Sequence, residues 1–140
     1  MSAPAPAPAA TVGGNIQTFL DKICENVEHL QAILVSDREG VVMLRSPNEF
    51  SQDERSEQMI TTIFSICSEQ TSKLERLGDT QHIISFFSGL IYLQANQLPL
   101  VVTMIAAPEV NTGQLLDLLP VISQALGDLR KAIATVVVQD

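Results

Sequence analysis

The sequence predicts an α/β (α+β) sandwich, in which one antiparallel sheet of about five strands carries helices on both faces. Three observations favour this class. Apolar residues recur every three or four positions in three segments, and short β-rich runs occur in two groups between them. The run 98–107 is almost continuously apolar, as expected for a central strand that is covered on both faces. The predicted order of elements is α-β-β-α-β-β-β-α.

The length and composition of the chain fit a single folded domain. It has 140 residues, of which 46% are hydrophobic, so a sizeable core is possible. Residues 1–14 are rich in Ala and Pro and offer no side chains that build a core, so we expect a disordered tail there. We expect the folded domain to occupy residues 15–136 and a C-terminal tail to occupy residues 137–140.

The first part of the domain is expected to form a helix and a hairpin. The apolar residues of the segment 15–30 share one helical face. Two β-rich runs follow, at 31–36 and 41–44, and the polar segment 37–40 between them ends in Gly. This pattern predicts a hairpin turn.

A second helix follows in the middle of the chain. It is expected to begin near the capping-box pattern Ser51-x-x-Glu54 and to end near Leu77, before Gly78. The acidic residues from Glu54 to Glu57 are expected on a solvated face of this helix, where they suit the positive end of its dipole.

The last part of the domain is expected to add three strands and a helix. The runs 81–87 and 90–95 form a hairpin around a two-residue turn, and the run 98–107 forms the central strand. The final helix is expected over residues 114–134, with a kink or a broken first turn at Pro120.

Charge and hydropathy argue against two classes of partner. The formal net charge is −8 and the eight basic residues are scattered, so nucleic acid binding is not expected. The longest apolar run is much shorter than the roughly 20 residues that cross a bilayer, so direct membrane insertion is not expected. A location at a membrane would therefore depend on another protein.

We find no pattern that indicates catalysis. Cys24 and Cys67 lie in apolar helical patterns and are interpreted as buried free thiols of a cytosolic protein. His29 and His82 have no Ser, Cys or carboxylate at a recognisable motif spacing. No phosphate-binding Gly loop is present either. We therefore expect no catalytic residues, no cofactor and no metal site.

The second helix carries more apolar surface than one sheet requires. Its apolar residues cover an arc of roughly 160°, whereas packing on one sheet requires about 100°. The surplus indicates a partner helix, or else deeper burial within a monomer. On this helix the predicted interface residues are Ile60, Phe64, Cys67 and Thr71. Met59, Ile66 and Leu77 form the other margin of the arc, and which margin faces the partner stays open.

The strand 81–87 is the second candidate contact. An edge strand with this apolar content and without Lys or Pro tends to aggregate unless another strand pairs with it. We therefore expect a dimer with one sheet continuous across both chains. On this strand the predicted interface residues are Gln81, Ile83, Ser85 and Phe87.

Three segments resemble a known family. They are ILVSDREGVV at 33–42, SEQTSKL at 68–74, and NQLPLVV at 96–102 with the NTG that begins at Asn111. They are similar to the roadblock family, and within it to the MAP kinase scaffold subunits of the late endosomal and lysosomal Ragulator complex. The resemblance covers roughly residues 15–136. The loop 108–110 departs from the family, because it is more acidic and bulkier than the small-residue version.

The resemblance implies both a fold and a function. It implies two helices on one face of the sheet and one on the other, and a heterodimer with a second roadblock-fold subunit. It also implies docking to a lipidated lysosomal anchor subunit on the cytoplasmic face of late endosomes and lysosomes. There the complex would recruit Rag GTPases for amino-acid sensing and TOR signalling, and would scaffold kinases of the MAP kinase cascade.

Two rival functions remain. One is a homodimeric roadblock regulator of a small GTPase, or a roadblock-type dynein light chain, because one fold hosts several functions. The other is a small-molecule sensor, which requires a hollow core with convergent polar groups. The core positions of this sequence are mainly aliphatic and offer few polar groups to a ligand, so the sensor function is less favoured than the scaffold.

Overall fold

A computed structural model describes residues 12–51 and 53–132 of the chain. The predicted tails at 1–14 and 137–140 fall outside these residues, except for residues 12–14, which belong to the first helix. The order of elements is the predicted one. The helices are α1 (Val12–Asn26), α2 (Glu54–Thr71) and α3 (Thr112–Ala125), and the strands are β1 (Leu30–Asp37), β2 (Val42–Ser46), β3 (His82–Phe86), β4 (Ile91–Gln97) and β5 (Leu100–Ala106).

The five strands form one antiparallel sheet in the order β2-β1-β5-β4-β3. The two hairpins are joined through β1 and β5, where Val35 pairs with Val102. Every side chain of β5 is buried, as its continuous apolar run predicts. The order leaves β2 and β3 at the two edges, and it confirms the prediction that the strand after the second helix is an edge strand.

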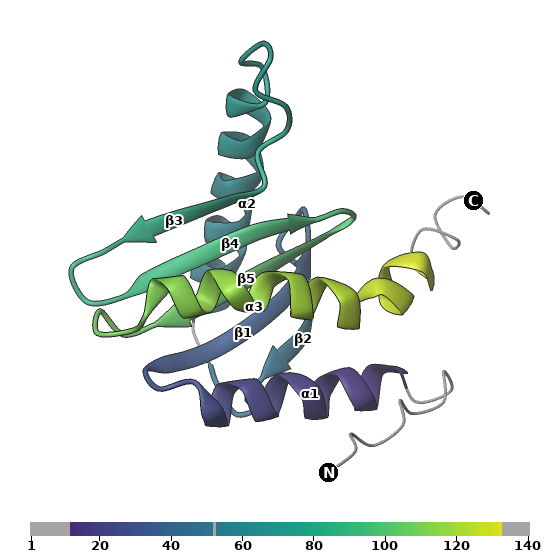
Figure 1. Cartoon of the computed structure of the whole chain (residues 1–140), viewed down its shortest axis with the longest axis vertical. Helices are drawn as coiled ribbons and strands as arrows, with labels where there is room; N and C mark the ends of the chain where they lie inside the picture. Colours follow the sequence, from purple (N-terminus) through teal and green to yellow (C-terminus); the bar gives the residue numbers. More distant parts are fainter. Residues whose placement is uncertain (1–11, 52, 133–140) are drawn as a thin grey trace.

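Helices cover both faces of the sheet, as predicted. α1 and α3 lie on one face, where their apolar sides build the larger core with β1, β4 and β5 (Figure 1). Leu20 of α1 and Ile122 of α3 are fully buried there. α2 lies on the other face over a smaller cluster, which contains Leu34, Tyr92 and Ile105. The roadblock arrangement of two helices against one is therefore confirmed.

The first helix is displaced relative to the prediction. It begins three residues before the expected start and ends at Asn26, not near residue 30. The chain leaves the helix because His29 takes a positive φ of 72°. Leu30 then already pairs with Ala106 of β5.

α2 ends at Thr71, so the prediction that it extends to Leu77 is wrong. Short hydroxyl side chains explain the early end. Thr71 Oγ1 donates to the Cys67 carbonyl at 2.9 Å, and Ser72 Oγ donates to the Ser68 carbonyl at 2.6 Å. Ser72 Oγ also accepts the Thr80 N–H at 3.1 Å, which draws the chain back toward β3. Such local bonds compete with a helical backbone.

The predicted start of α2 also needs correction, and the turn of α3 at Pro120 is not broken. Asp53, not Ser51, is the N-cap of α2, and its side chain makes no capping hydrogen bond. α3 continues through Pro120 and is interrupted only at Leu126, after which residues 127–132 are helical again. Pro120 is exposed, so the carbonyl that it leaves without a helix donor lies on the side that water reaches.

Candidate partner interface

The outer side of α2 is apolar. Met59, Ile63 and Ile66 are 52%, 51% and 54% exposed, and a helical period of 3.6 residues places them in one narrow stripe. The side of α2 that faces the sheet is mostly polar, because Glu57 and Thr61 are buried there. A helix of a monomeric protein normally shows the opposite arrangement. The stripe Met59–Ile63–Ile66 therefore has the character of a contact surface.

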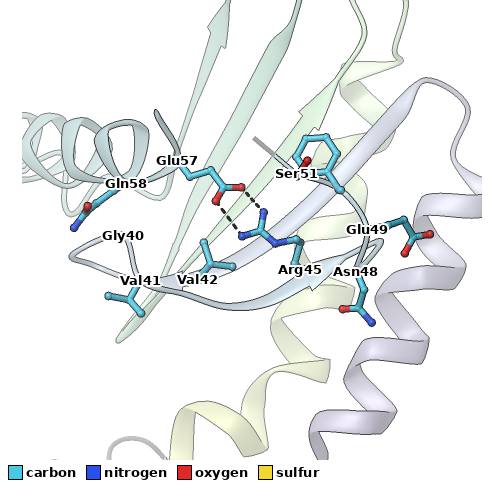
Figure 2. A pocket seen from close by; sticks show the side chains of 10 residues that line it. Gly40, Val41, Val42, Arg45, Asn48, Glu49, Ser51, Glu57 and Gln58 are labelled. Carbon is cyan, nitrogen blue, oxygen red and sulfur yellow. Dashed lines mark hydrogen bonds and ion pairs between the residues drawn. The ribbon is translucent and has the colours of Figure 1, made fainter. Parts of the chain in front are cut away.

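A buried ion pair attaches α2 to the sheet. Arg45 of β2 donates to both carboxylate oxygens of Glu57, with Nη2 at 3.0 Å from Oε1 (Figure 2). The Glu57 side chain is only 3% exposed, so the prediction of a solvated Glu57 is wrong. The hydrogen bonds to Glu57 raise the pKa of Arg45. The Arg45 guanidinium therefore stays charged, and the pair fixes the first turns of α2.

The turn between β1 and β2 packs closely against α2. Gly40 has a φ of +93°, and a Cβ atom built on it would lie 2.9 Å from the backbone of Gln58 (Figure 2). Ser65 Oγ donates to the Arg38 carbonyl at 3.0 Å on the same side of α2. A side chain at position 40 would push the turn away from α2. Gly40 thus serves both the turn conformation and the close approach.

The groove of Figure 2 lies around the ion pair and has a volume of about 470 Å³. Its charged side chains include Arg45 and Glu57, which already satisfy each other. Within residues 12–51 and 53–132, no group of three or more His, Cys, Asp or Glu residues could hold a metal ion. Over the same residues, no helix has the length and apolarity that crossing a membrane requires.

The backbone of β3 faces the open edge at alternate residues. The Phe87 N–H donates to the Leu90 carbonyl at 2.8 Å, and the Asn96 N–H donates to the Gln81 carbonyl at 2.8 Å. The register between β3 and β4 places the hydrogen-bonded pairs two residues apart. Residues 81, 83, 85 and 87 therefore bond to β4. The N–H and C=O groups of His82, Ile84 and Phe86 point away from β4.

The other edge of the sheet is protected. The register of β2 against β1 shifts between Val35 and Ser36, and such irregularities disturb the pairing of an additional strand. In addition, the Arg45 carbonyl accepts the side-chain N–H of Gln17 from α1 at 2.8 Å. Proteins blunt edges in these ways. Of the two edges, β3 is therefore the better template for pairing.

The structure divides the predicted interface residues of α2. Ile60 is half-buried, whereas Cys67 and Thr71 are exposed. Phe64 is only 2% exposed, because it faces the sheet of its own chain, and it therefore offers no surface to a partner. The exposed stripe Met59–Ile63–Ile66 instead lies on the other margin of the apolar arc, which includes Met59 and Ile66. Thr71 is hydrogen-bonded to Thr80 beside the start of β3.

The predicted strand residues differ in their exposure. Ile83 and Ser85 are half-buried, Gln81 is exposed and Phe87 is 51% exposed. Ile60 and Phe87 line one apolar hollow of about 330 Å³, together with Gly89, Leu90 and Tyr92. The ring of Phe87 meets that of Tyr92 edge to face, with centroids 5.5 Å apart. The hollow thus joins α2 to the end of β3.

The cysteines follow the prediction only in part. Both are free thiols, but Cys67 is exposed, so its predicted burial is wrong. Cys67 belongs to the flank of α2 that lies between the stripe and the sheet. Cys24 is half-buried against β2, and burial raises the pKa of its thiol.

Comparison with known proteins assigns the chain to a family. Residues 14–133 match the family described as "Mitogen-activated protein kinase kinase 1 interacting". The chain belongs to this family. It is 37% identical over 122 residues to the Ragulator complex protein LAMTOR3 of Xenopus tropicalis, across 87% of this chain and 94% of that protein. The Drosophila melanogaster homolog of LAMTOR3 is 34% identical over 119 residues, across 85% of this chain and 95% of that protein.

Solved structures have the same fold as this chain. The gliding protein MglB of Thermus thermophilus superposes with a TM-score of 0.69, at 12% identity over 94% of this chain and 99% of that chain. A roadblock/LC7 domain from Streptomyces avermitilis superposes with a TM-score of 0.56, at 11% identity over 87% and 97%. At such identities the likeness concerns the fold alone, which is the roadblock fold. The family is described by an interaction, and the relatives are named as parts of a complex.

Proposed function

We propose that the chain is a scaffold subunit of a Ragulator-type complex and forms a heterodimer with a second roadblock-fold subunit through α2 and β3. The observation that carries this proposal is that an exposed apolar surface and an unpaired strand edge lie next to each other. The apolar stripe of α2 and the open edge of β3 meet at one side of the molecule, where Ile60 and Phe87 line a common hollow. One partner can therefore cover both.

The pairing has a physical rationale on each surface. A strand added to β3 would bond to the outward backbone groups of His82, Ile84 and Phe86. A helix laid on the stripe would bury the exposed halves of Met59, Ile63 and Ile66, which contributes on the order of 1 kcal/mol for each side chain. The polar contacts that hold α2 on its own sheet keep the stripe directed outward.

The finer assignment rests on the relatives. LAMTOR3 proteins are named as parts of the Ragulator complex, and the family is named for its interaction with a MAP kinase kinase. We therefore propose that this chain docks to a lipid-anchored subunit at the cytoplasmic face of late endosomes and lysosomes. The assembled complex would recruit Rag GTPases for TOR signalling in response to amino acids, and would scaffold MAP kinase pathway kinases.

Light scattering behind size exclusion tests the pairing. The chain is co-expressed with a candidate roadblock-fold partner, as wild type and as Ile63→Asp. Wild type is expected to form a 1:1 heterodimer, and Ile63→Asp to lose it, because the pairing would bury a lone charge. Val121→Asp is the matched control, since Val121 is an equally exposed apolar residue (46%) on α3, away from α2.

Two outcomes would change the proposal. A heterodimer that tolerates Ile63→Asp as well as it tolerates Val121→Asp would remove the stripe from the interface. A stable homodimer that ignores the candidate partner would favour the regulator of a small GTPase or the dynein light chain.

A further inference from the structure

The second half of α2 projects beyond the edge strand β3 (Figure 1). Apolar packing does little to hold this end of the helix, because Ile66, Leu74 and Leu77 are 54%, 56% and 73% exposed. The last buried apolar side chain of α2 is that of Phe64, about two turns before the helix ends at Thr71. The direction of the helix end relative to β3 therefore depends on other contacts.

Polar side chains join this end of α2 to the sheet. Ser72 Oγ, at the C-cap of the helix, accepts the Thr80 N–H at 3.1 Å. The Thr80 carbonyl accepts a side-chain N–H of Asn96, which lies in β4, at 2.9 Å. The hydroxyl groups of Thr71 and Thr80 are also hydrogen-bonded to each other. Thr80 thus connects the end of α2 to β4, close to the start of β3.

We infer that Ser72, Thr80 and Asn96 form a latch that sets the direction of α2 relative to β3, and that these three residues determine affinity for the roadblock-fold partner without contacting it. The inference rests on the proposed pairing through α2 and β3, because one partner must meet both surfaces at once. A molecule whose latch is open presents the stripe at another angle to the strand edge. The apparent affinity then falls by the fraction of molecules whose latch is closed.

The latch has a recognisable thermodynamic signature. One hydrogen bond contributes a net factor of roughly five to an equilibrium, so the loss of one bond leaves most molecules closed. Loss of all three side-chain partners removes the preference for the closed state. The cost then appears in the association rate, because only the closed fraction can bind. A residue that contacts the partner acts by itself instead, and mainly on the dissociation rate.

Single and combined variants test the latch. Ser72→Ala, Thr80→Val and Asn96→Leu are prepared separately and as a triple variant, and surface plasmon resonance measures both rate constants with the candidate roadblock-fold partner. Each single variant should associate within about twofold of the wild-type rate. The triple variant should associate about fivefold more slowly or worse, at an unchanged dissociation rate. Thr112→Val, on the opposite face of the sheet, is the matched control for Thr80→Val and should leave both rates unchanged.

Two kinetic outcomes overturn the latch. The first is a triple variant whose association rate stays within about twofold of wild type. The second is a loss that lies in the dissociation rate, or that equals the product of the three single losses, because these residues would then contact the partner.

Amide hydrogen exchange in the wild-type chain alone tests the latch without a partner and without variants. The Thr80 amide should exchange more slowly than the amide of Leu77 in the exposed loop, because Ser72 accepts its N–H. Equal exchange rates of these two amides would overturn the latch and leave the proposed heterodimer intact. A wild-type chain that shows this protection but binds no roadblock-fold partner counts against the heterodimer instead.

Discussion

Arg45 of β2 and Glu57 of α2 form a two-point ion pair that joins one edge of the sheet to the helix with the apolar outer stripe. Both Arg45 amino groups donate to the Glu57 carboxylate, which is buried. Because one partner lies in the sheet and the other in the helix, the pair fixes the rotation of α2 about its own axis. The rotation decides which residues face outward, so a polar contact inside the chain sets the composition of the partner surface.

Removal of Arg45 is expected to destabilise the protein. Arg45→Met leaves a buried carboxylate without its cation, so the unfolding free energy should fall by about 2–4 kcal/mol. The double variant Arg45→Met/Glu57→Leu should recover part of this loss, because no lone charge remains. Urea denaturation at one fixed protein concentration measures both. A double variant no more stable than Arg45→Met would contradict the role given to the buried charge.

Gly40 should not tolerate a side chain. Gly40→Ala combines a positive φ with a Cβ atom 2.9 Å from the Gln58 backbone, so we expect a loss of about 1–3 kcal/mol. Gly89→Ala is the control, because nothing lies within 4 Å of its added Cβ. Thermal unfolding of the two variants compares them directly. Equal melting temperatures of Gly40→Ala and Gly89→Ala would mean that the β1–β2 turn does not pack closely against α2.

Phe64 and Ile66 separate folding from pairing. Phe64→Ala empties a buried site in the chain and should cost about 3–5 kcal/mol of unfolding free energy. Ile66→Ala removes a side chain that is 54% exposed, so it should leave chain stability nearly unchanged and weaken partner binding about tenfold. Chemical denaturation and a binding titration test the two effects. The reverse pattern would place Phe64 at the interface after all.

The half-buried thiol of Cys24 should make the unfolding free energy fall at alkaline pH. Burial raises the pKa of its thiol, so the folded state holds this proton more firmly than the unfolded state. Its contribution is present below the unfolded pKa of about 8.5 and is lost as pH rises through the folded pKa. Wild type should therefore lose stability above about pH 8.5 more steeply than Cys24→Ser. Parallel pH profiles of unfolding free energy would contradict this.

The order of helices and strands could be predicted because the periodicity of apolar residues distinguishes them, whereas the two-against-one arrangement of helices was implied by the family resemblance. The alternating and continuous apolar runs located all five strands. The apolar content of residues 81–87, which include no Lys or Pro, indicated that this strand lies at an edge of the sheet. Helix ends were less predictable. The end of α2 depends on Ser72 and Thr80, which meet only after the chain has folded.

The orientation of α2 could not be predicted from periodicity. A pattern of apolar residues shows that a helix has two apolar margins, but not which one faces the sheet. The choice depends on Glu57, whose partner Arg45 lies on another element. The predicted interface residues include Phe64, which is buried, and omit Ile63, which is exposed. The polar residues Glu57 and Thr61, four positions apart on one helical face, were the signal available.

Amide hydrogen exchange on β3 tests the central claim most directly. The amides of Ile83 and Ser85 bond within the sheet, so they should exchange slowly both in the chain alone and in the heterodimer. The amides of His82, Ile84 and Phe86 point to the open edge, so they should exchange quickly in the chain alone and become protected in the heterodimer. If these three amides exchange equally fast in the assembled heterodimer, β3 does not pair with the partner and the account is wrong.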